Sequence, residues 1–311
     1  LKINPFVFDK KNALNFVRTQ IESNSITTKI DKLFPDDDAN SPAPDLFEFP
    51  DNACDIPAIV VDNTPDNTQL NIIHKAITTV DELDEFLSKI DKILAIDTET
   101  TGLNHTIDKI VGISLAINDT NGAYIPIRHR DGTPNLFGGN NIAPNQLDIK
   151  TVYEKLWPVL TNPNIIKIGH NLKYDLHIMA NEGWDTTQIH PIDDTMLLSY
   201  ILHGTRHGHG LDELALMYLG HENIKFSSLF PPKTRDADMH FDGLKVSEVC
   251  QYAAEDACIC RALYDLMRPE LNADKKLQEL YETCDLPLIS ILVQMERTGV
   301  LVDRAKLQHL S

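Results

Sequence analysis

The sequence predicts an α/β fold in which a mixed central sheet, containing an antiparallel meander, is flanked by helices. Apolar, β-branched segments come first in the domain, and strand-like and helix-like segments then alternate along the chain. A third observation is the stretch ILAIDTETTGLN at residues 93–104, where an apolar strand runs directly into acidic residues and a turn. The predicted domain is organised around this strand.

The N-terminal residues differ from the rest of the chain in composition. Residues 9–34 carry apolar side chains three or four positions apart, which predicts helix. Residues 35–67 are rich in Asp, Asn and Pro, which indicates a linker or an irregular surface segment. A compact domain is therefore expected to begin near Leu70.

The first half of that domain is predicted to build the meander. A short strand is followed by an acidic helix that starts at Thr79 or Asp81. Three further strands follow, and a turn containing Asn-Gly joins the last two, which favours antiparallel pairing. These elements are expected at residues 71–77, 79–90, 93–96, 110–118 and 122–127.

The second half of the domain is predicted to alternate strands with helices. Residues 128–145 and 221–244 lack a clear period and are expected to be irregular. The final helix is expected to break or bend at Pro287. The expected elements are helix 147–160, strand 165–169, helix 170–183, a strand-to-helix step at 189–202, and helices 211–220, 246–267 and 271–298.

The amino-acid composition argues against some classes of protein function. A net charge of −18 argues against a broad nucleic-acid-binding surface, but it allows nucleic acid at a cleft where metal ions supply positive charge. No apolar run approaches ~18 residues, so no membrane association is expected. Five cysteines without a C-x-x-C pair indicate reduced thiols in a cytoplasmic protein. The Leu start suggests a fragment of a longer chain.

The acidic end of the central strand predicts a metal site. Asp97 and Glu99 are two residues apart, so their side chains point to the same face of the strand. Two carboxylates on one face repel each other, and a cation between them removes the repulsion. Hard oxygen ligands of this kind favour Mg²⁺ or Mn²⁺.

Two helices supply further candidates. Asn171 and Asp175 are four residues apart at the start of a predicted helix, and so are Tyr252 and Asp256 on a later one. Each pair alone is also explained without function, the first as a helix cap and the second as a half-buried Tyr beside a surface Asp. A strand-to-helix junction is, however, where open α/β sheets place their ligands.

Together these motifs outline a two-metal hydrolytic site. Four carboxylates, from Asp97, Glu99, Asp175 and Asp256, could not all stay ionised in one cleft without cations beside them. Two ions ~3.5–4 Å apart would activate a water and stabilise the leaving oxygen of a phosphoryl displacement. Tyr252, with an ordinary pKa near ~10, is a poor base, and we expect it to hold the attacking water in line.

Other polar residues are given structural roles. Asp193 and Asp194 precede a predicted helix and are expected to serve as N-cap and turn residues. Three histidines, at positions 203, 207 and 209, alternate with glycines and indicate a flexible loop rather than a zinc site.

The ordered motif set resembles the 3′–5′ proofreading exonuclease domain of bacterial family A DNA polymerases, the DNA polymerase I family. This domain belongs to the Tyr-containing branch of the DEDD exonuclease superfamily. The matching segments are AIDTETTGL, IGHNLKYDLHIMA, DDTMLLSYIL and YAAEDA, and they span roughly residues 70–270. The stretch LPLISILVQMERTGVLVD is similar to the start of the polymerase domain in that family.

The resemblance implies a ribonuclease H-like exonuclease fold and a division of the chain. The implied parts are the tail of an upstream 5′-nuclease region at 1–34, a linker at 35–69, the 3′–5′ exonuclease domain at 70–270 and the truncated start of the polymerase domain at 271–311. The resemblance also implies a slot for the terminal nucleotides. Its lining would be Thr100, Leu103, Asn171, Tyr174 and Phe226, whereas Arg206 is not assigned a phosphate contact because the spacing around it departs from the family pattern.

The implied activity is removal of nucleoside 5′-monophosphates from the 3′ end of DNA, with two Mg²⁺ or Mn²⁺ ions as cofactors. The implied partners are a single-stranded 3′ end and the polymerase domain of the same parent chain, in a monomeric bacterial cytoplasmic protein. Two alternatives remain. The domain could be a non-catalytic scaffold, or it could be a ribonuclease D-like RNA exonuclease, although such an enzyme is not expected to carry the C-terminal stretch.

Overall fold

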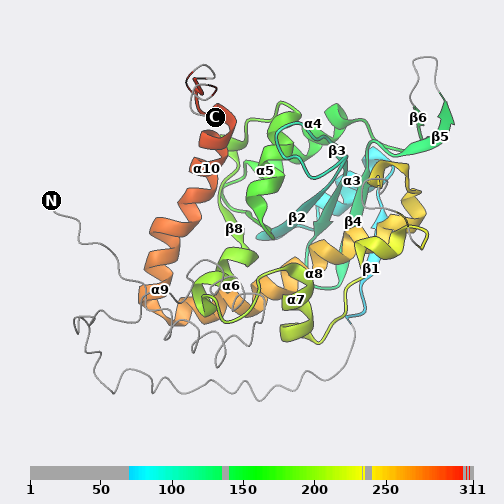
Figure 1. Ribbon diagram of the computed structural model, residues 1–311. Coiled ribbons are helices and arrows are strands. Elements are labelled where there is room, and N and C mark those ends of the chain that lie inside the picture. The colour runs from blue at the N-terminus through cyan, green and yellow to red at the C-terminus, as the bar shows by residue number, and fades with distance from the viewer. Residues whose placement is uncertain are drawn as a thin grey trace, which may run out of the picture. The chain divides into compact units, whose positions relative to one another are not determined.

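A mixed sheet lies at the centre of the computed structural model, which describes residues 70–134, 140–232, 234, 240–303, 306 and 308 (Figure 1). Over these residues the strand order is β1-β4-β3-β2-β7-β8. The expectations for residues 1–34 and 35–69 lie outside the described residues. The strands are β1 (Ile73–Ala76), β2 (Ile93–Thr100), β3 (Ile110–Ala116), β4 (Asn121–Pro126), β7 (Ile166–Gly169) and β8 (Ile192–Asp194).

The predicted meander is confirmed. Strand β3 is antiparallel to both β2 and β4, whereas β1, β7 and β8 join the sheet in parallel. The register between β2 and β3 shifts just after Glu99, where Thr100 pairs with Ile110. An irregularity of this kind bends a strand and re-aims its side chains. It lies at the acidic end of β2.

Helices cover both faces of the sheet. The α-helices are α3 (Val80–Leu87), α4 (Ile149–Leu160), α5 (Leu172–Asn181), α6 (Thr195–His203), α7 (Leu211–Leu214), α8 (Val246–Ala273), α9 (Lys275–Leu280) and α10 (Leu286–Thr298). Shorter turns are the 3₁₀ segments η2 (Thr186–Gln188), η4 (Phe226–Leu229) and η6 (Phe241–Gly243), and the π segments η3 (Ala215–Leu219) and η7 (Tyr281–Asp285). Among these described helices, none has the length and apolar character to cross a membrane.

Successive side chains of β2 point to opposite faces of the sheet and pack in two different hydrophobic cores. Leu94 and Ile96 pack in the cluster shared with α3, α4 and α5. Ala95, between them, belongs to the cluster shared with α6 and α8. Since successive strand residues face opposite sides, the same rule continues past Ile96 into the acidic residues. The small side chain at position 95 leaves room for the long helix α8 to pack close to the strand.

The loop expected at residues 128–145 was wrong in part. Part of the segment 128–145 is a hairpin of β5 (Arg130–Pro134) and β6 (Asn140–Ile142), not a loop. Its polar sequence has no alternating pattern, because neither of its faces is needed for the core. The long helix expected over residues 271–298 starts later, at Lys275. Helix α9, the π segment η7 and α10 then follow one another without a gap to Thr298, and η7 ends two residues before Pro287.

Helix α8 ends later than the expected Met267. Helix α8 runs through Pro269 to Ala273, because Leu271 is fully buried in the core and holds the last turn in place. Asp274 then caps α9 by accepting from two backbone N–H groups. Pro287 lies in the first turn of α10, where a missing N–H is tolerated. The implied boundary at 270/271 thus falls inside α8, and it stays a prediction.

The close approach of β3 to Tyr124 generates a stability prediction. A Cβ at Gly112 would overlap the hydroxyl group of Tyr124, which is fully buried and hydrogen-bonded to His129 at 2.7 Å. We expect Gly112→Ala to destabilise the fold by about 1–3 kcal/mol through overpacking. Chemical denaturation measures the loss. Gly243→Ala, where a Cβ meets open space, is the matched control, and equal effects of the two substitutions would contradict the prediction.

Candidate active site

Strand β2 directs its acidic residues toward α8. Asp97 lies on the face of Ala95, and the carboxylate oxygens of Asp97, Glu99 and Asp256 all fall within 4.8 Å of one another. Asp256 comes from α8, more than 150 residues later in the chain. The structure therefore brings together three of the four predicted carboxylates as one group.

The fourth carboxylate approaches from the opposite side of β2. Asp175, on α5, is 2% exposed and lies outside the three-residue group. Its Oδ1 accepts hydrogen bonds from the backbone N–H of Thr98 at 2.9 Å and from the Thr98 hydroxyl at 2.6 Å. Thr98 shares the α5-facing side of the strand with Ile96. Asp175 is thus fixed at the acidic end of β2 by the residue between Asp97 and Glu99.

Thr98 was not singled out from the sequence. A Thr between two acidic residues is ordinary in a strand, since β-branched residues are favoured there. Its role depends on the position of α5, which only the folded chain supplies. The signal available in the sequence was the alternation itself, which places Thr98 on the face opposite to Asp97 and Glu99.

The electrostatics of the group favour a cation. Burial, followed by the neighbouring carboxylates, raises the pKa of Glu99 and Asp256, and burial raises the pKa of Asp97 to about 6. Burial, followed by the charge of Asp97, also raises the pKa of Asp175. Glu99 is 9% exposed, and its Oε1 atom is buried without a hydrogen-bond partner. Carboxylate oxygens that repel one another, one of them unpartnered, fit a hard divalent ion.

Tyr252 belongs to an aromatic group beside the carboxylates. It precedes Asp256 by one helical turn on α8, and burial, then the charges of Asp256 and Glu99, raises its pKa. Its ring lies 6.2 Å from that of Phe226 and 6.2 Å from that of Phe241. Phe226 and Phe241 are nearly parallel, with centroids 6.3 Å apart. The exposed ring of Phe226, packed on the buried ring of Phe241, therefore adjoins the acidic group.

The other predicted substrate residues, which are Thr100, Leu103, Asn171 and Tyr174, differ in their exposure and in their hydrogen bonds. The hydroxyl oxygens of Thr100 and Tyr174 lie 2.9 Å apart, and each is within hydrogen-bond distance of the Gly102 carbonyl oxygen. Leu103, in the following turn, is 92% exposed and free to contact a ligand. Asn171 is not in the first turn of α5, as the i, i+4 argument assumed. It is the N-cap residue, with a left-handed backbone at φ +63° and no side-chain cap bond.

The paired aspartates have separate roles. Asp194 caps α6 as predicted, and it also accepts from the backbone N–H groups of Asn171 and Leu172. Asp193 is not a turn residue. It is buried, forms an ion pair with Arg268 at 3.0 Å and accepts a hydrogen bond from Tyr281. Its partners lie about 75 to 90 residues later, so local sequence gives no sign of them.

The histidine segment is not among the potential metal groups found in the described part of the chain. His209 instead bridges Ser199 at 2.8 Å and the carbonyl of Gly204 at 2.7 Å.

The buried pair His221–Glu255 was also missed by sequence analysis. Glu255 accepts from His221 at 3.0 Å and from the backbone N–H of Ile224 at 2.7 Å, which anchors the segment leading to η4 beside Asp256.

The mixed sheet and the acidic group at the end of β2 together form a site that could bind divalent metal ions. A family model described as 3′–5′ exonuclease matches residues 74–272. This chain therefore belongs to the 3′–5′ exonuclease family found in DNA polymerases I, as its motifs predict.

Individual relatives support the same family membership. The chain is 33% identical over 252 residues to DNA polymerase I of Rhizobium leguminosarum, covering 76% of this chain and 24% of that protein. It is 33% identical over 222 residues to DNA polymerase I of Pseudomonas aeruginosa, covering 71% and 23%. The chain thus spans about a quarter of these relatives' length. A structure of the POL domain of Pol1 from M. smegmatis with DNA primer-template and dNTP shares the fold, with a TM-score of 0.53 and 22% identity over 76% of this chain and 34% of that one.

Repulsion within the acidic group generates a pH-dependent prediction. We expect Asp97→Asn to stabilise the metal-free chain, because it removes a charge that is unfavourable in the folded state. The folded pKa of about 6 lies above the ordinary value of 3.8, so this unfavourable ionisation is present above pH 6 and is lost as Asp97 is protonated below it. The gain should be on the order of 1–3 kcal/mol near pH 8 and small near pH 4.5, since one pKa unit corresponds to about 1.4 kcal/mol.

Thermal unfolding in chelator, at both pH values, measures this gain. The control is Asp91→Asn, which changes an exposed aspartate before β2. A gain that is equal at the two pH values, or equal in the control, would show that the acidic group is not repulsive in the folded chain.

Proposed function

We propose that this chain hydrolyses the 3′-terminal phosphodiester bond of single-stranded DNA and releases nucleoside 5′-monophosphates. The observation that carries the proposal is the convergence of Asp97, Glu99 and Asp256, with an unpartnered buried oxygen, inside a 3′–5′ exonuclease domain. All four carboxylates of the motif set, and Tyr252, are present. An inactive scaffold has no need to keep mutually repelling carboxylates together.

The acidic group would hold two divalent ions, Mg²⁺ or Mn²⁺. Asp97, Glu99 and Asp256 would bind one, and Asp97 and Asp175 would contact the other. When bound, such ions supply a nucleophile at neutral pH and positive charge at the leaving oxygen. The donor set fits, because all the ligand atoms are carboxylate oxygens.

The protein's own groups position the reaction. Tyr252 stays protonated at neutral pH because its pKa is raised, so it orients the attacking water by hydrogen bonding and does not act as a base. Thr98 fixes the orientation of Asp175 through two hydrogen bonds. Because Asp175 lies on the α5 side of β2, the site is closed on two sides by elements from distant parts of the sequence.

The substrate surface suits a single strand. Phe226, which is 39% exposed and backed by the buried Phe241, offers a stacking face next to Tyr252, and Leu103 projects from the turn after β2. Stacking of bases on aromatic rings is tolerant of sequence, which suits removal of any terminal nucleotide. Thr100, Asn171 and Tyr174 would complete the slot near the sugar and phosphate. With a net charge of −18, binding relies on the cations and on stacking rather than on a basic groove.

The wider context is also a proposal. The relatives named DNA polymerase I are about four times longer than the matched region, so we propose that this chain is the proofreading part of such a polymerase. It would act as a monomer in the bacterial cytoplasm, beside the polymerase domain of its parent. A mispaired 3′ end would then be trimmed before synthesis resumes.

The activity is tested on an internally labelled single-stranded DNA with Mn²⁺, with Mg²⁺ and with chelator. We expect metal-dependent release of mononucleotides from the 3′ end, and its loss in Asp97→Ala. An RNA strand of the same sequence tests the ribonuclease alternative. Absence of release with both metals, on DNA and RNA, would refute a catalytic role and favour the scaffold.

Asp175→Ala is expected to abolish release, because Asp175 would contact one of the two ions. The chain should still unfold cooperatively, because the substitution removes an ionisable group whose burial is unfavourable. Asp91→Ala is the exposed control and should keep activity. Full activity of Asp175→Ala would remove this residue from the site.

Thr98→Val tests positioning. The substitution keeps the shape of the side chain but removes the hydroxyl that donates to Asp175 at 2.6 Å. Loss of a group that orients a metal ligand typically lowers activity or metal affinity roughly 10–100-fold. We expect a loss in this range, relieved in part by raising the Mn²⁺ concentration. A loss that Mn²⁺ does not relieve would contradict a role through metal binding.

A further inference from the structure

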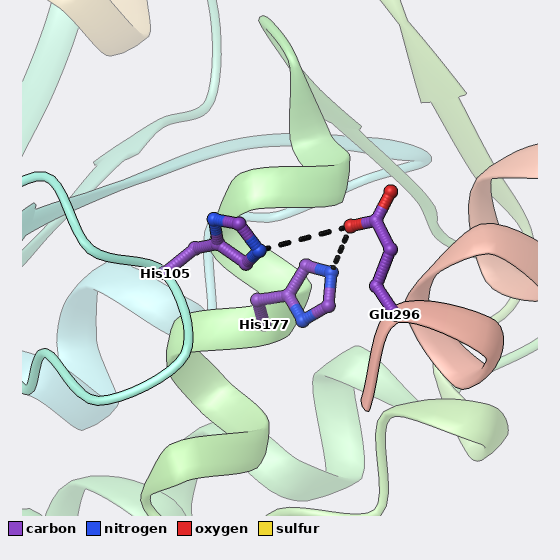
Figure 2. Close-up of side chains that lie close together, drawn as sticks. All are labelled: His105, His177 and Glu296. Carbon is purple, nitrogen blue, oxygen red and sulfur yellow. Dashed lines mark hydrogen bonds and ion pairs between the residues drawn. The ribbon is translucent and has the colours of Figure 1, made fainter. Parts of the chain in front are cut away.

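Three potential metal ligands converge at a second place in the molecule. His105 lies in the loop between β2 and β3, His177 is on α5, and Glu296 is on α10 (Figure 2). Their ligand atoms all lie within 4.8 Å of one another. Glu296 Oε2 is 2.8 Å from His177 Nε2 and 3.8 Å from His105 Nε2, and the two imidazole centroids are 4.6 Å apart. Segments about 70 and 120 residues apart thus meet at one carboxylate oxygen.

This cluster lies on the opposite side of α5 from the acidic group. Asp175 and His177 are two residues apart, which corresponds to a rotation of roughly 200° about a helix axis. Asp175 points to Thr98 on β2, whereas His177 points to α10. The two sets of ligands therefore share a helix but not a site.

The ligand positions are fixed by contacts other than their own. Asn181, one turn after His177, donates to the backbone carbonyls of His105 and Asp108, each at 2.9 Å, and so holds the loop. Arg297, next to Glu296, donates to Asn181 Oδ1 at 2.8 Å and to the carbonyl of His177 at 3.3 Å. The loop and α10 are thereby tied to α5, and the three side chains are brought together in advance.

The carboxylate is oriented for the histidines. Lys173 binds Glu296 Oε1 at 2.6 Å and leaves Oε2 facing both imidazoles. Hydrogen bonding of the outer oxygen of a carboxylate is the usual arrangement around a metal ligand. His177 is 1% exposed, whereas the His105 side chain is 39% exposed, so the cluster is anchored inside and open on one side.

We propose that His105, His177 and Glu296 bind a divalent transition metal of the Zn²⁺ type. Two imidazole nitrogens and one carboxylate oxygen are a donor set that Zn²⁺ accepts with a fourth position left to solvent. Imidazole ligands select against Mg²⁺ and Ca²⁺, so this site differs in ligand chemistry from the acidic group. The bound ion joins the loop after β2, α5 and α10, and it does not depend on the nuclease function.

The competing explanation is an ion-pair latch without metal, in which Glu296 simply links Lys173 and His177. The experiment uses the full 311-residue chain and Co²⁺ as a spectroscopic probe, with excess Mg²⁺ present to occupy the acidic group. We expect one equivalent of Co²⁺ to give the visible absorption of a nitrogen-ligated, four- or five-coordinate ion, and Zn²⁺ to displace it.

Variants locate the ion. His105→Ala and Glu296→Gln should each weaken Co²⁺ binding by at least about 10-fold, in line with the loss of metal-site contacts. Two controls should keep the absorption: His74→Ala, an exposed histidine on β1, and Asp97→Asn, which disables the acidic group. In chelator, His105→Ala should unfold at the temperature of the unmodified chain, and only the unmodified chain should gain stability from Zn²⁺.

Three results would overturn the proposal. One is a chain that gives no such absorption with Co²⁺. Another is absorption that persists in both His105→Ala and Glu296→Gln. The third is absorption lost in Asp97→Asn and kept in His105→Ala, which would place the ion at the acidic group. Any of these outcomes would leave Glu296 as an ion-pair latch only.

Discussion

Mutual repulsion among carboxylates at one end of β2 is the constraint on which the rest of the site depends. Asp97, Glu99 and Asp256 are held within 4.8 Å of one another by a strand in the centre of the sheet and a long buried helix. Packing of apolar residues around Ala95 and Ala257 supplies the free energy that keeps these charges together. Under the proposed function, bound cations would relieve this repulsion and so stabilise the folded chain.

Helix α5 transmits this arrangement to the C-terminal part of the chain. Its β2-facing side carries Asp175, and its other side carries His177 against α10. Leu172 and Leu176 on α5 pack in one core with Ile289 and Val293 on α10. Anything that fixes α10 against α5, such as an ion at the second cluster, thus also restrains the helix that presents Asp175.

A buried polar network joins α8 to the segments that follow it. Asp193, at the end of β8, binds Arg268 on α8 and accepts from Tyr281 in η7. Burial raises the pKa of Asp193, and the hydrogen bond from Tyr281 and the charge of Arg268 offset part of this rise. Removing one member would leave a buried charge without its partner, which is far more costly than replacing the whole group. Residues 271–298 are therefore integrated with the core of the domain.

The sequence by itself determined the class of fold, the meander and the identity of the acidic residues. Those depend on local rules: the period of two in β2, capping at Thr79 and Asp194, and a motif order that can be matched along the chain. The hairpin β5–β6 and the end of α8 could not be predicted in this way, because tertiary contacts overrode weak or contrary local signals.

Only the tertiary structure decided which groups meet. Asn171 was expected on α5 from its spacing to Asp175, yet it is a left-handed N-cap residue, and Asp175 is instead fixed by Thr98. Asp193 was assigned to a turn, although its partners lie on α8 and η7. The cluster of His105, His177 and Glu296 has no sequence pattern at all. Spacing along a chain constrains only neighbours on the same helix or strand, whereas contacts across 70 to 160 residues are set by how the elements pack.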